Sequence, residues 1–332
     1  MQQQTGKFIL SLDFELMWGV RDLVTIEQYG DHLRGVHTAI PLMLQSFTKY
    51  KVGATFATVG FLFFENKAQL LQHLPKRQPQ YQNINLSPYH SHIQQQVGDA
   101  YPADLYHFGS HLIQLIRDTP GQEIGTHTFS HYYCQEPGQT VADFEADLQM
   151  AVAVAKNRGI DIKSIVFPRN QYNVDYLQVC HQNGITSVRG NEASWLYQAR
   201  SYKKETLVRR AIRLLDAYIN ITGHNCYSDA DMCATQPFNI PASRFLRQYK
   251  PKLKSLEGLR LKRITKAMTH AAKNNLTYHL WWHPHNFGIN QNQNIAFLEK
   301  ILDHYQTLHR QYNFTNYTMA NLAKQLEEGH GK

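Results

Sequence analysis

The sequence lacks the long apolar runs of a membrane protein. A helix that crosses a bilayer needs roughly 18 or more consecutive apolar residues, and no stretch of the 332-residue chain approaches that length. The opening "MQQQTGK" has no basic region leading into an apolar one, and the following "FILSL" is interrupted at once by Asp13. We therefore expect neither a signal peptide nor a transmembrane segment, and we expect a cytoplasmic protein.

Cysteine and glycine signatures are also missing. The four cysteines form no C-x-x-C pair, so their spacing indicates neither a zinc knuckle nor a disulfide framework, and reduced thiols fit a cytoplasmic chain. No G-x-G-x-x-G follows a predicted strand, which leaves a dinucleotide-binding fold without support. Internal repeats and Pro/Gly-rich linkers are absent, so we expect a single domain over residues 1–332.

The chain has a formal net charge of +8, and acidic residues are scarce in one stretch of it. Between Pro241 and His270 the only acid is Glu257, against these cations: Arg244, Arg247, Lys250, Lys252, Lys254, Arg260, Lys262, Arg263 and Lys266. Such a stretch attracts anions. We expect no nucleic-acid partner. Three alternatives stay open: a peripheral contact of Arg244–Lys266 with an anionic membrane, a sugar or lipid phosphate as partner, and a basic face that is merely solvated.

What the sequence does contain is an alternation of short β-rich apolar runs with helical spacing. This alternation predicts a parallel sheet with right-handed connections, and about seven such units favour a closed or nearly closed β/α barrel. Thr140 is expected to cap a helix that stops at Gly159. Two segments look like additions to the barrel: a cap at about 65–120 and a basic helical segment at about 191–270.

Polar residues stand directly after four of the predicted strands. The C-terminal ends of all strands of a β/α barrel meet at one face, where active sites are built. Residues far apart in the sequence should therefore converge there. The four groups are Asp13 with Glu15, His127 with His131, Arg169 with Asn170, and His283 with His285.

The histidine pair and the carboxylate pair together predict a metal site. On a helical turn, His127 and His131 at i and i+4 would reach one ion, although a chance pair is an alternative in a chain with 18 histidines. Asp13 and Glu15, two apart on a strand, face the same side, and buried acids need partners. Two histidines and one carboxylate hold a divalent cation with an open position, which frees the second carboxylate to act as a base.

The other two groups allow several roles. Arg169 could hold a carboxylate through two parallel hydrogen bonds, or it could be a surface arginine. His283 or His285 could donate a proton to a leaving amine, or pack among the neighbouring aromatic residues Trp281, Trp282 and Phe287. The chain is rich in tyrosine, with 19, which suits either sugar binding or a half-polar core.

The order of several motifs resembles the polysaccharide deacetylase family, also called NodB-homology deacetylases. The motifs are "ILSLDFE", "GATFATVG", "EIGTHTFSHY", "FPRNQ", "GITSVRG" and "LWWHPHNF". The resemblance implies a distorted (β/α) TIM-like barrel and a metal-dependent N- or O-deacetylase that acts on an acetylated saccharide, with zinc as the expected metal. It also implies that His127 and His131 bind the metal, that Asp13 is the base oriented by Arg169, and that His283 is the acid.

The chain departs from the family pattern in its first, third and last motifs. The family's adjacent aspartates are replaced by D-F-E, so we assign Asp13 as base and Glu15 as metal ligand, with the reverse left open. Pro168 precedes the arginine and Tyr172 follows three residues later, where the family has Arg-x-Pro-Tyr. Beyond these, we expect the substrate to contact Trp281, Trp282, Tyr172 and His285.

Two other functions compete with the removal of acetyl groups, N-acetyl first, from a saccharide or glycan precursor. One is an amidohydrolase for a small non-sugar amide or ureide, which the long segments 65–120 and 191–270 disfavour. The other is a catalytically silent barrel that binds carbohydrate or phosphate. The presence of both carboxylates, both histidines and an arginine argues against it.

Overall fold

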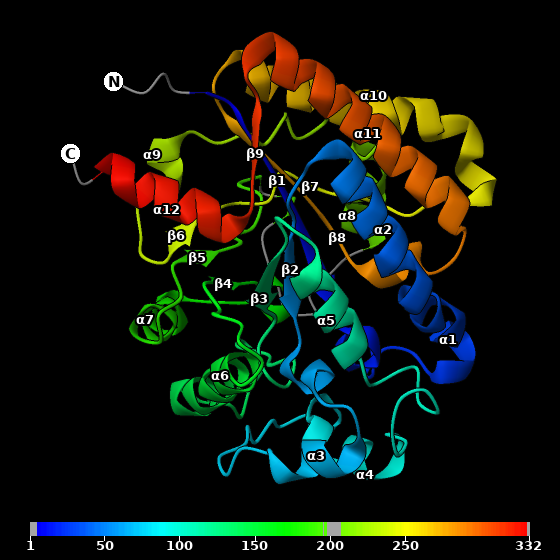
Figure 1. Ribbon diagram of the computed structural model, residues 1–332, viewed down its shortest axis with the longest axis vertical. Helices are drawn as coiled ribbons and strands as arrows, with labels where there is room; N and C mark the ends of the chain where they lie inside the picture. The colour runs from blue at the N-terminus through cyan, green and yellow to red at the C-terminus, as the bar shows by residue number, and fades with distance from the viewer. Residues whose placement is uncertain (1–4, 195, 198–206, 331–332) are drawn as a thin grey trace.

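The computed structural model describes residues 5–194, 196–197 and 207–330, so the first four residues and part of the predicted 191–270 segment lie outside the described residues. In the described part, nine strands form one sheet in the order β6-β5-β4-β3-β2-β1-β8-β7, with β9 paired to β1 beside this path (Figure 1). All pairs are parallel, as predicted. The strands are β1 (Lys7–Phe14), β2 (Thr55–Thr58), β3 (Glu123–Thr126), β4 (Ser164–Ile165), β5 (Ser187–Val188), β6 (Phe238–Asn239), β7 (Arg244–Phe245), β8 (Thr277–Trp282) and β9 (Thr315–Tyr317).

A single segment joins the two ends of this sheet. Strands β6 and β7 are at opposite ends of the strand order, yet only residues 240–243 separate them in the sequence. The amide of Ile240 donates to the carbonyl of Val188 in β5 at 2.8 Å, and the amide of Ser243 donates to the carbonyl of His279 in β8 at 2.8 Å. The sheet therefore curls round on itself, which confirms the predicted distorted (β/α) barrel.

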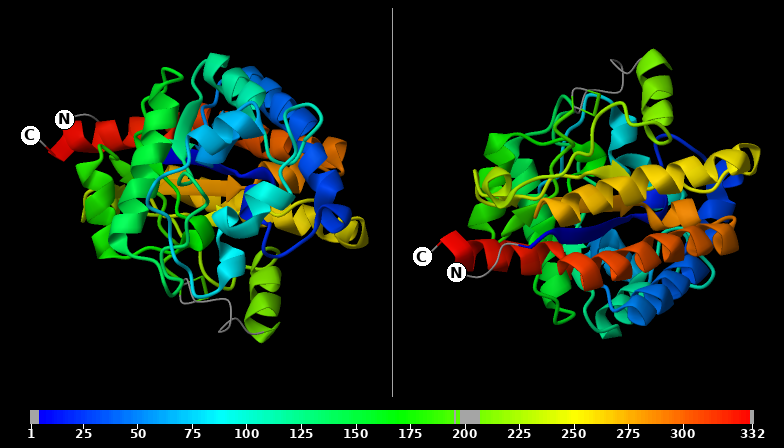
Figure 2. Two further views of the ribbon diagram at one scale, coloured as in Figure 1. Left: turned by 90° about the horizontal axis from the view of Figure 1, so that it is seen from below. Right: turned by 90° about the horizontal axis from the view of Figure 1, so that it is seen from above.

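Helices wrap the outside of the curled sheet in both further views (Figure 2). Thr140 caps α6 by accepting a hydrogen bond from the amide of Asp143, as predicted, and Gly159 follows the helix with a left-handed φ of +71°. The helices are α1 (Ile26–Arg34), α2 (Val36–Tyr50), α3 (Lys67–Gln72), α4 (Ile93–Gln95), α5 (Ser110–Asp118), α6 (Val141–Lys156), α7 (Val174–Gln182), α8 (Leu207–Asp216), α9 (Asp229–Met232), α10 (Glu257–Lys273), α11 (Gln291–Tyr312) and α12 (Met319–His330).

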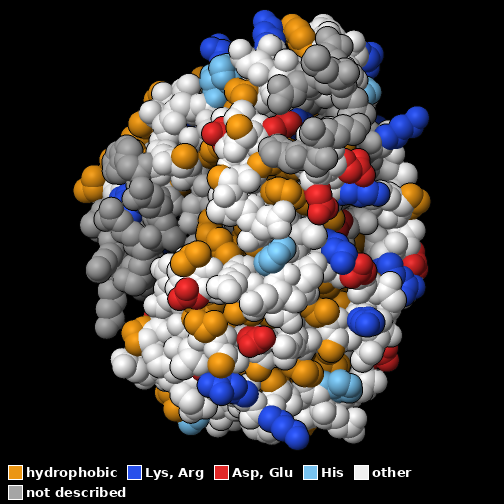
Figure 3. All heavy atoms as spheres, turned by 90° about the vertical axis from the view of Figure 1, so that its left-hand side faces the viewer, with side chains coloured by type: hydrophobic (Ala, Val, Ile, Leu, Met, Phe, Trp, Pro, Cys, Tyr) orange, Lys and Arg blue, Asp and Glu red, His pale blue; other side chains and the backbone are white. Residues whose placement is uncertain are grey.

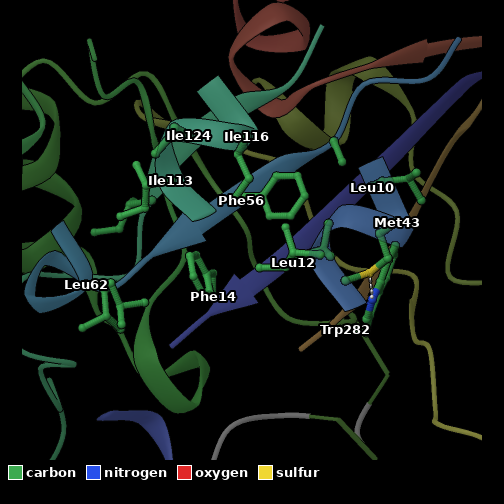
Figure 4. Close-up of a cluster of buried hydrophobic side chains, with 14 of the residues drawn as sticks. Leu10, Leu12, Phe14, Met43, Phe56, Leu62, Ile113, Ile116, Ile124 and Trp282 are labelled. Atoms are coloured by element: carbon green, nitrogen blue, oxygen red, sulfur yellow. Dashed lines mark hydrogen bonds between the residues drawn. The ribbon is translucent and has the colours of Figure 1, made fainter. Parts of the chain in front are cut away.

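Strand β1 separates the core from the barrel interior. Its alternate side chains Leu10, Leu12 and Phe14 lie in one cluster of buried hydrophobic residues outside the sheet (Figure 4). Because side chains alternate along a strand, Ser11 and Asp13 point to the other side, into the barrel. The same alternation that builds the core thus delivers a carboxylate to the interior.

Two expectations about the long segments need adjustment. The stretch between β2 and β3 holds the short helices α3 and α4, and it ends in α5, which packs against β3 as part of the barrel wall. The segment 191–270 is not purely helical, because it contributes β6 and β7 to the sheet. These two-residue strands are too short to leave a period-two pattern in the sequence. No helix in the described residues is both long and apolar enough to cross a membrane.

Candidate active site

The two carboxylates of the first motif lie together in the barrel. Asp13 is near the end of β1 and Glu15 directly follows it, and both are almost fully buried, at 3% and 4% exposed. Nε2 of His283 lies 3.7 Å from Oδ2 of Asp13 and 3.7 Å from Oε1 of Glu15. The structure thus brings both carboxylates and the histidine that follows β8 to one place.

Glu15 faces the histidine pair. Its Oε2 lies 3.3 Å from Nε2 of His127 and 3.2 Å from Nε2 of His131. One ligand atom from each of the three residues lies within 4.8 Å of the other two, which makes them a group that could hold a metal ion. Asp13 is not part of this group, although it is close by.

The protonation of this group suits a cation. Nδ1 of His127 donates its proton to the carbonyl of Val166 at 2.8 Å, so Nε2 is the ring nitrogen that faces Glu15 and that could bind a cation. Burial lowers the pKa of His131 to about 4, so that ring is neutral at neutral pH. Burial raises the pKa of Glu15, but the charge of His283 and hydrogen bonds from the two rings outweigh it and hold the pKa well below its usual range. An ionised carboxylate and two imidazole nitrogens are a ligand set that fits a divalent cation such as zinc.

The backbone that carries the histidines is a loop after a short strand, as the sequence predicted, and the pair reaches one place without a helical turn. The loop follows β3 and passes through left-handed conformations at Thr128 (φ +64°) and His131 (φ +59°), which bring the ring centroids of the histidines to 5.0 Å. Asp147 on α6 fixes the loop, since its carboxylate accepts from the amides of Phe129 at 2.7 Å and Ser130 at 3.1 Å. This positioning contact was not predicted, although an acid on the apolar side of a helix is a signal for one.

Arg189 is the residue that holds Asp13. Its Nη1 and Nη2 donate to Oδ1 and Oδ2 of Asp13, both at 2.7 Å, and both residues are buried. Nη2 also donates to the side-chain oxygen of Asn170 at 3.2 Å. Burial raises the pKa of Asp13, but the Arg189 charge outweighs it and the pKa is lowered. Arg189 lies near the end of the predicted strand "ITSVRG" and directly follows the observed β5, yet no role was assigned to it.

Arg169 does not make the contact expected of it. Its guanidinium pairs with Asp22, lies 3.7 Å from Glu136, and stacks 4.2 Å from the ring centroid of Tyr133. Arg169 has a left-handed φ of +54° in the short turn after β4, and this local geometry directs its side chain toward Asp22. The prediction that Arg169 orients Asp13 is therefore wrong.

The two histidines after β8 differ in environment. Their rings stack with centroids 4.8 Å apart, but the side chain of His283 is 24% exposed and that of His285 only 6%. Burial and the charge of His283 lower the pKa of His285 to about 3. Because His285 is neutral at neutral pH, His283 is the better placed proton donor.

The predicted substrate contacts lie in three different environments. Trp281 is half-buried in the site, with the Arg189 guanidinium 4.0 Å from its ring centroid and Phe245 4.7 Å away. Trp282 cannot contact a substrate in this structure, because it is fully buried on the core side of β8 and donates to Sδ of Met43 at 3.4 Å (Figure 4). Adjacent strand residues face opposite sides, so only one of the two tryptophans can face the interior. Tyr172 stacks on Phe167 at 5.2 Å.

Comparison with known proteins gives the same family as the sequence motifs. The model of the polysaccharide deacetylase family matches residues 29–188. The predicted resemblance to this family is confirmed. The match includes His127 and His131 but neither Asp13, Glu15 nor Arg189, so the geometry alone carries the roles of those three. The family indicates deacetylation of polysaccharides as the type of reaction. No match to this sequence is found among the curated proteins.

Solved structures agree with the fold. A protein from Mycobacterium smegmatis assigned to the polysaccharide deacetylases matches with a TM-score of 0.61 and 10% identity, covering 99% of this chain and 93% of its own. A similarly assigned protein from Pseudomonas aeruginosa matches with a TM-score of 0.55 and 10% identity, covering 98% and 91%. A 4-alpha-glucanotransferase from Thermococcus litoralis also matches, with a TM-score of 0.50, 10% identity and coverage of 96% and 38%. Since an enzyme named for another reaction shares the fold, the activity has to be argued from the site.

Proposed function

We propose that this chain is a metal-dependent deacetylase that hydrolyses the acetyl group, N-acetyl in first place, of a saccharide or glycan precursor. The observation that carries the proposal is the convergence of two differently held carboxylates. Glu15 faces two histidine nitrogens at 3.2–3.3 Å, while Asp13 next to it is bound by Arg189 through two hydrogen bonds. This arrangement supports one carboxylate as the ligand and the other as the base.

Glu15, His127 and His131 would hold the cation, with zinc as the expected metal. Three protein ligands leave coordination positions open, as catalytic metal sites require. When bound, a divalent cation lowers the pKa of water and stabilises negative charge on a carbonyl oxygen.

Asp13 would take the proton of the attacking water. Arg189 keeps this carboxylate ionised and fixes its plane, and buried surroundings exclude competing solvent. A base held in this way needs little reorganisation when the water approaches. Arg189 therefore acts as a positioning residue, and Asp13 as the catalytic base.

His283 would protonate the departing amine. Its Nε2 is at 3.7 Å from both carboxylates, and its ring is partly exposed, so a substrate can reach it. General acid assistance of this kind contributes about 10²–10⁴-fold to a rate. Trp281 and Phe245 form an apolar wall beside His283 that suits a methyl group and the face of a sugar ring.

The test is acetate release by metal-loaded and metal-stripped protein from N-acetylated sugars that are free, nucleotide-linked or lipid-linked. We expect release by the loaded protein only, and loss of release in the Asp13→Asn variant. Turnover of a small ureide or amide without turnover of any acetylated sugar would replace the proposal by the amidohydrolase. Binding of sugar without turnover in the loaded protein would identify a catalytically silent barrel.

A further inference from the structure

Helix α8 (Leu207–Asp216) and the turn after it present apolar side chains to solvent. Val208 is 69% exposed, Leu215 51% and Ile219 59%. Leu214 and Ile221 are exposed as well, so five of the 14 exposed large hydrophobic residues in the described part of the chain fall within residues 208–221. Scattered exposed apolar residues are normal, but a gathering of this kind marks a surface that another partner covers.

The other side of α8 is polar and faces the protein. Asp216 is fully buried and accepts hydrogen bonds from the hydroxyl of Tyr197 at 2.9 Å and from Nη1 of Arg244 at 3.3 Å. Arg209 is also buried, and Nε of Arg213 donates to the carbonyl of Leu196 at 2.9 Å. A surface helix normally turns its apolar side inward. In α8 this arrangement is reversed, so core packing does not explain its apolar residues.

Exposed lysines lie beside this apolar surface. The carbonyl of Gly223 accepts from Arg263 of α10, and the carbonyl of Arg213 accepts from Arg247 at 3.5 Å, so α8 adjoins the segment 247–266. The only acid between residues 241 and 270 is Glu257, which pairs with Arg260. The exposed cations of the two segments are Arg210, Lys250, Lys252, Lys254, Lys262 and Lys266.

The basic stretch identified in the sequence is therefore divided into two parts. Arg244, Arg260 and Arg263 are only 3–4% exposed and bind groups inside the protein, so they are not available for an external contact. The lysines remain outside. On the face drawn in Figure 3, by contrast, Lys and Arg side chains are interspersed with Asp and Glu. In both views of Figure 2, α8 projects from the body of the molecule.

We propose that the apolar side of α8, with the exposed lysines of residues 250–266, docks on the surface of an anionic lipid bilayer. An apolar helix side flanked by cations and free of acids is the pattern of peripheral membrane helices, whose apolar residues enter the headgroup region while cations meet lipid phosphates. A second copy of this chain is disfavoured as the occupant, because it would bring the same cations against each other. The inference concerns binding alone and does not rest on the proposed deacetylase activity.

The experiment is vesicle flotation with the full chain. We compare phosphatidylcholine vesicles with vesicles in which about a third of the lipid is phosphatidylglycerol, at about 0.1 and 0.5 M salt. We expect binding to the anionic vesicles only, weakened by salt. The variant Leu215→Glu/Ile219→Glu should bind at least about tenfold more weakly, because two charges replace the residues that enter the bilayer.

The matched control is Leu115→Glu/Val174→Glu, which adds the same charges at exposed apolar residues of α5 and α7, 40% and 76% exposed. It should bind like the unchanged protein. Lys252→Gln/Lys254→Gln leaves α8 intact and should reduce binding at low salt, so the test does not depend on one variant folding. Circular dichroism confirms folding for each.

Three results would overturn the proposal. The first is no binding of the unchanged protein to anionic vesicles. The second is equal loss of binding in the α8 variant and its matched control. The third is a dimer in light scattering that the α8 variant converts to a monomer, because the apolar side would then be covered by a second copy.

Discussion

Arg189 binds Asp13 through two hydrogen bonds of 2.7 Å, although the strands that carry the two residues are four positions apart in the sheet. Strands in a flat sheet lie about 4.8 Å apart, so β5 and β1 would be about 19 Å from each other. An arginine side chain cannot span that distance. The contact exists because the sheet curls, and the position of the proposed base therefore depends on barrel closure.

This relationship predicts unequal effects of the two arginines. Arg189→Ala removes both hydrogen bonds and leaves a buried carboxylate unpaired, so we expect kcat to fall by about 10²–10⁴-fold. Arg169→Ala breaks a partly exposed pair with Asp22 and should change kcat less than about tenfold. Steady-state kinetics on an acetylated substrate, with metal content measured in parallel, gives the comparison. Equal losses in both variants would contradict the assignment to Arg189.

Measurements of metal content should distinguish the roles of the two neighbouring carboxylates. Glu15→Gln removes the ligand that faces both histidines, so bound zinc measured by mass spectrometry should drop strongly. Asp13→Asn should keep the metal and lose about 10²–10⁴-fold in kcat, since only the base is changed. His127→Ala/His131→Ala provides the reference for loss of metal. The reverse result for Glu15 and Asp13 would mean that Asp13 is the ligand.

The adjacent tryptophans should also have separate effects. Trp282→Phe opens space in the core and removes the hydrogen bond to Met43. The free energy of unfolding, measured in urea, should therefore fall by about 1–3 kcal/mol, with KM unchanged. Trp281→Phe should leave stability within about 0.5 kcal/mol and raise KM, since Trp281 borders the site. An increase in KM for Trp282→Phe at unchanged stability would contradict the placement of its ring in the core.

Asp216 on the polar side of α8 should make the free energy of unfolding depend on pH. Burial raises the pKa of Asp216, but Arg244 and the hydrogen bonds of Thr222 outweigh it and lower the pKa to about 2. A folded-state pKa below the unfolded value means that this stabilisation is complete at neutral pH and is lost as the pH falls from about 4 toward 2. Asp216→Asn should lower the free energy of unfolding by about 3 kcal/mol at neutral pH, and by less at about pH 3. A difference that does not change with pH would show that the charge of Asp216 is not involved.

Local sequence patterns were sufficient to predict the barrel and most of the site. The alternation of apolar runs gave the parallel barrel, and Thr140 marked the start of α6. The rule that polar residues after parallel strands meet at one face predicted that Asp13, Glu15, His127, His131 and His283 converge, which they do. These features follow from local patterns and from a property that all β/α barrels share, so no side-chain packing had to be known.

Three features depend on how the whole chain packs: which arginine reaches Asp13, which tryptophan faces the site and which side of α8 is exposed. Arg169 lies in the turn after β4 and Arg189 directly follows β5, and the choice between them depends on sheet curvature and on one left-handed residue. Trp281 and Trp282 differ by one residue, and strand register alone sends them to opposite sides. The reversed α8 depends on buried partners from distant segments, such as Arg244 for Asp216. Contacts between distant segments are set by how the whole chain packs, and local sequence patterns do not contain that information.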